Sequence, residues 1–146
     1  RGVKLDVHLF GDGPLASRLQ DQAQRLNVAV TFHGAVPPKQ LKPQLCRLDV
    51  VVQTSWWESQ GMAILEAAAT GCAIIGTDVG ALASLNSALA KTAPGDAAGL
   101  ADALLRAAAD RATTQSAGRA AAAEVAASYC VSQQLTRWHE LAASRS

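Results

Sequence analysis

The chain of 146 residues has few aromatic side chains, few charges and no long apolar run. Aromatic residues make up 4% and charged residues 17%, against 49% apolar residues, many of them alanine. This composition excludes an intrinsically disordered chain and predicts one globular domain. The longest apolar stretch, around residues 62–69, is interrupted by Glu66 and ends before Gly71. That is far too short to cross a bilayer, so we expect a soluble protein.

Cysteine and clustered basic residues are also scarce. Cys46, Cys72 and Cys130 are odd in number, far apart and outside any C-x-x-C or Cys/His spacing. This pattern supports neither a disulfide framework nor a zinc site, and reduced thiols in a cytoplasmic protein are the simpler interpretation. The net charge is +1 and the Lys and Arg residues are scattered, which is not the electrostatic footprint of a nucleic-acid-binding protein.

Apolar segments with strand patterns alternate with segments of helical periodicity. Strands are predicted at residues 5–10, 28–32, 48–54, 72–77 and 88–92. Helices are predicted at residues 15–26, 37–46, 61–70, 98–109, 113–128 and 131–143, with Asp96 capping the fourth of these. The run at 48–54 is apolar almost throughout, as expected for a parallel strand covered on both faces. The alternation predicts an α/β fold with a doubly wound parallel sheet, spanning 1–146 as one domain.

In such sheets ligands bind at the carboxyl ends of the strands, beside helix N-termini. The loops to consider are therefore 11–14, 34–38, 54–61 and 78–81. Gly11 and Gly34 stand at strand ends, where glycine lets the backbone approach a ligand or turn sharply. Glycine is common in the turns of every α/β protein, so these two residues alone do not distinguish a ligand site from ordinary turns.

Two glutamates frame the predicted start of the 61–70 helix. Glu66 has no cation three or four residues away, and a carboxylate on a buried helix costs several kcal/mol unless it is satisfied. The two hydroxyls of a sugar diol match its two oxygens, and an Arg or Lys from elsewhere in the fold is an equally open partner. Glu66 lies roughly 8 Å along the axis from the helix start, where Glu58 precedes it. Taken alone, Glu58 is better explained as a solvated loop acid; together, the two acids could hold two parts of one extended ligand, such as a nucleotide sugar.

The surroundings of this pair resemble a known family. The segment 55–71, S-W-W-E-S-Q-G-M-A-I-L-E-A-A-A-T-G, is similar to the E-x7-E signature of the group 1 (family four) retaining glycosyltransferases. Four further segments resemble landmarks of that family in the same order: L-F-G-D-G-P at 9–14, V-T-F-H-G at 30–34, T-D-V-G at 77–80 and P-G-D at 94–96. The resemblance covers nearly the whole chain.

The resemblance implies a Rossmann-like donor domain of a GT-B glycosyltransferase, which moves a sugar from a nucleotide-sugar donor to a glycan or lipid-linked acceptor. No cofactor and no essential metal are implied. By residue, it implies that Glu66 binds the ribose hydroxyls and that Glu58, the catalytic candidate, faces the donor sugar. The other substrate-binding positions it implies are Gly61, Met62 and Ala63 near the sugar or diphosphate, Gly34 and Ala35 near the base, and Gly11 on the first strand turn.

The sequence also departs from the family pattern. Family donor domains open with a further strand and helix whose Arg and Lys clamp the diphosphate, and an acceptor domain precedes them. This chain opens almost directly on its first predicted strand, and the turn at 80–84 lacks the usual acid of G-G-x-x-E. We therefore expect an N-terminally truncated donor domain that binds its donor more weakly and transfers little or nothing by itself. A non-catalytic nucleotide- or sugar-binding module, or a scaffold of the same fold, is the alternative.

For the full-length protein, the expected setting is bacterial surface polysaccharide or glycolipid assembly, in the cytoplasm or peripheral to the inner membrane.

Several other side chains have simpler explanations than ligand binding. Trp56 and Trp57 could stack on a sugar or a base, but we expect one in the core and one at the surface. His33, at a strand end, is expected to bond to backbone rather than line a base pocket. Leu135 and Trp138 are expected to anchor the last helix to the body.

Overall fold

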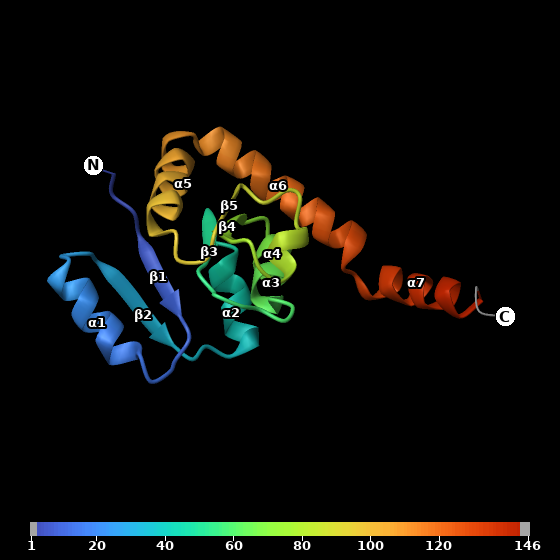
Figure 1. Cartoon of the computed structure of the whole chain (residues 1–146), viewed down its shortest axis with the longest axis horizontal. Coiled ribbons are helices and arrows are strands. Elements are labelled where there is room, and N and C mark those ends of the chain that lie inside the picture. Colours follow the sequence, from blue (N-terminus) through green and yellow to red (C-terminus); the bar gives the residue numbers. More distant parts are fainter. Residues whose placement is uncertain (1–2, 144–146) are drawn as a thin grey trace. The chain divides into compact units, whose positions relative to one another are not determined.

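The computed structural model describes residues 3–143, apart from the side chains of residues 137 and 141. The chain divides into two compact units, Arg1–Pro43 and Gln44–Ser146, each with parallel strands and helices (Figure 1). Every hydrogen-bonded strand pair among the described residues is parallel, and the strands form a two-stranded and a three-stranded sheet. The predicted α/β class with parallel strands is therefore confirmed.

The first unit is a β-α-β arrangement. Strands β1 (Val7–Phe10) and β2 (Val30–Gly34) pair in parallel and are joined by helix α1 (Ala16–Arg25). Residues 7–9 pair in order with residues 30–32, and the register then shifts so that Phe10 lies opposite Gly34. This irregularity lies beside Gly11 and Gly34, the two glycines discussed below. Helix α2 (Pro38–Leu45) follows and crosses the boundary between the units.

The second unit contains a three-stranded parallel sheet in the order β3-β4-β5. Its strands are β3 (Val50–Gln53), β4 (Ala73–Thr77) and β5 (Ala90–Thr92). Its further helices are α3 (Met62–Ala69), α4 (Ala81–Ser84), α5 (Ala97–Ala109), α6 (Arg111–Ser128) and α7 (Val131–Ala143). The short α4 falls where only a turn was predicted. None of the helices in the described range is both long and apolar enough to cross a membrane.

The core of the second unit is built around β4. Ile74 and Ile75 are completely buried, and α3, α5 and α6 all contact this strand. Ala103 and Ala107 of α5 pack on Ile75, so small side chains bring the helix close to the sheet. The expectation that β3 is covered on both faces was wrong, since Val52 is 40% exposed. The strand of this sheet that is buried at all of its residues is β4, the middle one in the order β3-β4-β5.

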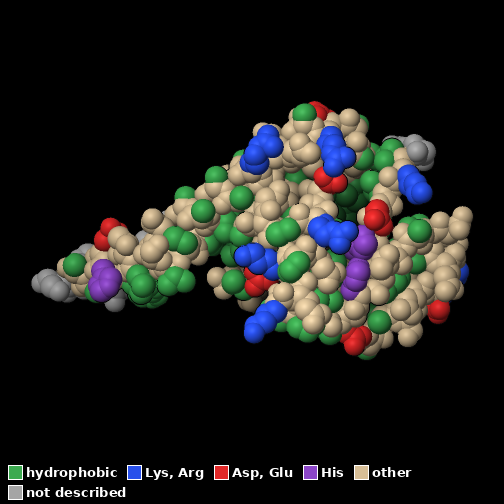
Figure 2. All heavy atoms as spheres, turned by 180° about the vertical axis from the view of Figure 1, so that it is seen from behind, with side chains coloured by type: hydrophobic (Ala, Val, Ile, Leu, Met, Phe, Trp, Pro, Cys, Tyr) green, Lys and Arg blue, Asp and Glu red, His purple; other side chains and the backbone are tan. Residues whose placement is uncertain are grey.

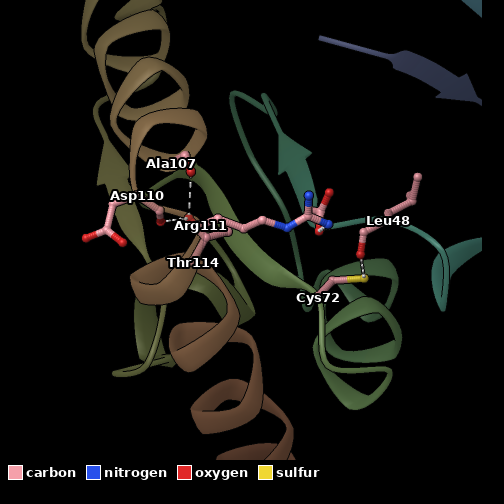
Figure 3. A network of polar contacts seen from close by, with 7 residues as sticks. Leu48, Cys72, Ala107, Asp110, Arg111 and Thr114 are labelled. Atoms are coloured by element: carbon pink, nitrogen blue, oxygen red, sulfur yellow. Dashed lines mark hydrogen bonds and ion pairs between the residues drawn. The ribbon is translucent and has the colours of Figure 1, made fainter.

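A short turn at Asp110 joins α5 to α6. Asp110 accepts a hydrogen bond from the backbone N–H of Thr113 and so caps α6. The buried hydroxyl of Thr114 lies 2.9 Å from the carbonyl oxygens of both Ala107 and Asp110 (Figure 3). Further along the same view, the thiol of Cys72 lies 3.5 Å from the carbonyl oxygen of Leu48. Burial raises the pKa of the Cys72 thiol, which fits a packed rather than a reactive cysteine.

Glu124 fastens α6 to the segment that leads into β5. Its carboxylate accepts hydrogen bonds from the backbone N–H groups and the side chains of Asn86 and Ser87, at 2.6–3.3 Å. Partial burial raises the pKa of Glu124, but the hydrogen bonds from Ser87 and Asn86 outweigh it, so the pKa lies below its ordinary value of 4.5. No sequence pattern pointed to this contact, because its partners are almost forty residues apart.

Glu124→Gln is expected to destabilise the fold by about 1–2 kcal/mol at pH 7, allowing for solvent screening at this half-buried site. A group whose pKa is depressed by folding contributes stability above its unfolded pKa and loses it as the pH falls through its folded pKa. The difference between the variant and the unaltered chain should therefore vanish below the depressed pKa. Urea unfolding at a series of pH values from 7 downward measures it. Glu140→Gln, at an exposed position on α7, should change nothing at any of these pH values.

Candidate functional site

Three loops follow the strands of the second unit at the carboxyl edge of its sheet. They comprise residues 54–61 after β3, residues 78–80 after β4 and residues 93–96 after β5. Because the three strands are parallel, their carboxyl ends meet at one edge. This edge is where an open α/β sheet accepts ligands, and two of the three loops were named by the sequence.

The 54–61 loop is held in place by β4 and the turn after it. The hydroxyl of Thr77 donates a hydrogen bond to the carbonyl oxygen of Ser55 at 2.7 Å. The backbone N–H of Ala81 donates to the carbonyl oxygen of Gln60, also at 2.7 Å. Gly80 completes the attachment, since a Cβ there would lie 2.7 Å from Cβ of Glu58. The loop is therefore preformed, and the backbone carrying Glu58 has little freedom to move.

Glu58 stands at the end of a chain of polar side chains. Nε2 of Gln53 donates to Oγ of Ser55 at 3.3 Å, and that hydroxyl donates to Oε1 of Glu58 at 2.9 Å. Oε2 of Glu58 has no hydrogen-bond partner in the described part of the chain. This arrangement orients a half-buried carboxylate and leaves one of its oxygens able to accept a hydroxyl.

Gln53 is a residue of this site that sequence reasoning missed. Its Oε1 is buried and accepts no hydrogen bond from any described residue, and a Cβ on Gly61 would lie 3.8 Å from it. A buried acceptor without a donor costs about 1–3 kcal/mol. The available signal was a polar residue at the carboxyl end of an otherwise apolar strand.

Helix α3 starts directly after this loop without a side-chain cap. Gly61 has a φ of 78°, a left-handed conformation that glycine adopts without steric cost, and its backbone turns the chain into the helix. Met62 and Ala63, the first two residues of α3, are both exposed. The first-turn N–H groups thus lie at the site with the positive end of the helix dipole.

Glu66 lies on α3, but its side chain is exposed, so the prediction of a buried carboxylate was wrong. Its neighbours Leu65 and Ala67 are 5% and 0% exposed. Because alanine occurs on both faces of the helix, the sequence does not show which face packs on the sheet. Glu66 lies on the face that does not pack. No described residue forms a hydrogen bond or an ion pair with Glu66, so the alternative of a basic partner elsewhere in the described chain is also wrong.

In the first unit the structure brings Gly11 and Gly34 together. The backbone N–H of Gly11 donates to the carbonyl oxygen of Gly34 at 2.8 Å, and both residues have positive φ, 121° and 65°. Ala35 follows and is exposed. Two predicted positions at the ends of β1 and β2 are thus adjacent.

The histidines of the first unit have a different environment from the one expected. Nε2 of His33 and Nδ1 of His8 lie 2.9 Å apart, so His33 bonds to a side chain and the expected backbone partner was wrong. The ring of Phe10 stacks on His33 with centroids 4.5 Å apart. The contacts of His33 with His8 and Phe10 join β2 to β1, so the pattern of one strand could not reveal them.

The expectation that one of the two adjacent tryptophans lies in the core was wrong as well. Trp56 and Trp57 are each 76% exposed, so neither lies in the core. Leu135 and Trp138 are 55% and 70% exposed and do not anchor α7. On the face drawn in Figure 2 the Lys and Arg side chains are dispersed and form no continuous stripe, as the sequence indicated.

Comparison with known proteins identifies relatives. The model of the family described as "Glycosyl transferases group 1" matches residues 1–110. The alpha-monoglucosyldiacylglycerol synthase of Streptococcus pneumoniae is 32% identical over 74 residues, which cover 49% of this chain and 17% of that protein. The matched part of the chain thus spans about a sixth of this curated relative.

Solved structures share the fold. HepE from Anabaena, solved with UDP, superposes with a TM-score of 0.83 at 24% identity, over 96% of this chain and 41% of that one. The C-terminal domain of the group 1 glycosyl transferase LpcC from Francisella tularensis superposes with a TM-score of 0.69 at 24% identity, over 79% of this chain and 62% of that one. At these identities the likeness establishes the architecture, which is Rossmann-like.

Proposed function

Because the chain belongs to the group 1 glycosyl transferases, we propose that it is the nucleotide-sugar-binding domain of a retaining glycosyltransferase. The full-length enzyme would transfer a sugar to a glycan or lipid-linked acceptor held by a further domain. A relative named for synthesis of a glucosylated diacylglycerol and a structural neighbour solved with UDP support this class of substrates. No essential metal enters the proposal.

One observation carries the proposal. Two carboxylates, Glu58 and Glu66, flank an uncapped helix start, and no described cation neutralises either of them. Carboxylates accept hydroxyl hydrogen bonds, and helix N-termini attract phosphate. A ligand with hydroxyls at both ends and a diphosphate between them matches this order of groups, and a nucleotide sugar has that structure.

The roles follow from the chemistry of each position. Glu66 accepts the two ribose hydroxyls. Glu58, oriented through Ser55, faces the donor sugar and stabilises positive charge that develops on the sugar ring as the nucleotide leaves. The backbone N–H groups at Gly61, Met62 and Ala63 approach the diphosphate and the sugar.

The base position is assigned to the first unit. We place the base near Gly34 and Ala35, with Gly11 beside them. The hydrogen bond between Gly11 and Gly34 supports this, because it sets two side-chain-free backbone segments next to each other at the strand ends. Peripheral contact with a bacterial inner membrane from the cytoplasmic side is the setting that a lipid-linked acceptor would require.

Calorimetric titration with UDP, GDP and ADP tests the proposal. One of the three should bind with a dissociation constant in the millimolar range or below. Pyrophosphate titrated in parallel separates recognition of the ribose and base from recognition of the phosphates, and should bind more weakly than the preferred nucleotide. Absence of binding by all three nucleotides at several millimolar would exclude a nucleotide-sugar site in this chain. We expect little or no sugar transfer by the chain alone.

A further inference from the structure

The exposed ring of Trp56 contacts a second loop, the turn after β5 that contains Gly95. A Cβ on Gly95 would lie 2.8 Å from Cη2 and 3.3 Å from Cζ2 of Trp56, so the six-membered edge of the indole rests against the backbone of the turn after β5. The same side chain is 76% exposed. Trp57 and Trp138 are exposed to a similar degree, at 76% and 70%, so the contact with Gly95 is the feature that distinguishes Trp56.

The loop that carries Trp56 and the turn that contains Gly95 are each fixed by a hydrogen bond. The segment carrying Trp56 is attached to β4 through the carbonyl oxygen of Ser55, which accepts from Thr77 at 2.7 Å. On the other side, Gly95 precedes Asp96, whose carboxylate caps α5 by accepting from the N–H of Gly99 at 2.8 Å. The backbone segments on both sides of the indole are therefore fixed, and a ligand that stacks on the ring does not have to order them.

The ring also lies two residues from the candidate catalytic acid. Glu58 follows Trp56 on the same loop and keeps Oε2 without a partner in the described part of the chain. The 54–61 loop thus carries a flat apolar ring and, two residues further along the chain, a carboxylate oxygen that can only accept hydrogen bonds. A pyranose matches both features, because one face of the ring consists of C–H groups and its rim carries hydroxyl donors. A uracil offers a single N–H donor on its edge and matches less well.

We propose that Trp56 is a stacking platform for a pyranose ring, with Gly95 as the residue that positions it. The proposal rests on the proposed function and adds a sugar subsite to it. The pyranose can come from the donor or from the acceptor, and the two sources share the same chemistry at the ring. A nucleobase on Trp56 is the competing arrangement.

The experiment follows the indole N–H resonances of the 146-residue chain by NMR. Trp57→Phe and Trp138→Phe variants assign the Trp56 signal. UDP, UDP-glucose, methyl α-glucopyranoside and methyl α-mannopyranoside are titrated separately. The Trp56 signal should shift with UDP-glucose if the donor sugar stacks there, or with the glycosides if the acceptor sugar does. It should not shift with UDP alone.

Matched variants separate the platform from general effects. Trp56→Ala should weaken binding of the sugar that shifts its signal by about tenfold. Trp57→Ala, which removes an equally exposed ring from the same loop, should leave that binding unchanged. Gly95→Ala should weaken it as Trp56→Ala does, because the added methyl group displaces the ring. Gly71→Ala introduces the same left-handed strain, at φ 88° against 83°, with no atom within 4 Å of the new Cβ, and should have no effect on binding.

The outcomes distinguish this proposal from the proposed function. If UDP binds but no sugar-bearing probe shifts Trp56, the platform is wrong and the nucleotide site stands. A shift of equal size with UDP alone assigns the ring to the base and overturns the pyranose subsite. If no nucleotide binds while a glycoside shifts Trp56, the sugar subsite stands and the nucleotide site fails. If neither nucleotides nor glycosides act on the chain, both are overturned.

Discussion

Replacing Glu66 by glutamine is expected to weaken nucleotide binding by about two orders of magnitude and to leave the fold intact. The side chain is exposed and has no partner among the described residues, so the free energy of unfolding should change by less than about 0.5 kcal/mol. In the proposed site the carboxylate accepts two ribose hydroxyls, and hydrogen bonds to a charged group contribute about 1.5–3 kcal/mol each. The amide retains one acceptor oxygen and no charge. Calorimetry with the preferred nucleotide measures the loss.

Glu140→Gln is the matched control, because it removes one negative charge from another exposed helical position. It should bind nucleotide as the unaltered chain does. Equal losses in both variants would indicate a general effect of net charge. Nucleotide binding by Glu66→Gln at full strength would show that the ribose lies elsewhere, and the proposed site would then have to be rebuilt around Glu58 and the start of α3.

Gly118→Ala is expected to destabilise the second unit by about 2–3 kcal/mol. A Cβ at this position of α6 would lie 2.1 Å from the carbonyl oxygen of Gly71 and 3.1 Å from the nitrogen of Ala73. Both neighbours are backbone atoms at the entrance to β4, so no side chain can rotate to relieve the overlap. Overpacking of this kind typically costs 1–3 kcal/mol or more, which exceeds the roughly 0.5–1 kcal/mol that alanine gains over glycine inside a helix.

Thermal and urea unfolding measure this effect. Gly13→Ala is the control, since a Cβ at Gly13 meets no atom within 4 Å and its φ is not positive. That variant should unfold like the unaltered chain. A Gly118→Ala chain that gains stability would mean that α6 does not pack against the turn between α3 and β4 at the distance described, and the close contact of helix and sheet would be refuted.

Much of the fold was predictable because it depends on short-range patterns. The strand at 72–77 was predicted from its apolar run and is β4, Ala73–Thr77. The helix predicted at 61–70 is α3, and Gly71 follows it with a φ of 88°, as a glycine after a helix C-terminus does. Asp96 caps α5 as predicted. In each case neighbouring residues carry the whole signal, so no knowledge of the tertiary fold was needed.

Exposure was harder to predict where alanine is abundant. Glu66 was placed in a buried environment because small apolar residues surround it, yet those residues occupy both faces of α3 and only one face packs. The same reasoning failed for Trp56 and Trp57, since a large aromatic side chain is expected in a core that here consists mainly of Ile, Leu and Ala. Hydrophobicity indicates that a residue can be buried, whereas packing partners decide whether it is.

Local residue patterns were thus sufficient to predict the order and type of most strands and helices, the parallel arrangement of the strands and the E-x7-E pair. The reason is that periodicity and backbone preference act over a few residues. The attachment of the 54–61 loop through Thr77 and Ala81, the support of Trp56 by Gly95 and the contacts of Glu124 could be found only in three dimensions. Each joins segments about twenty to forty residues apart. Their meeting depends on the lateral order of the strands, which side-chain alternation along one strand does not encode.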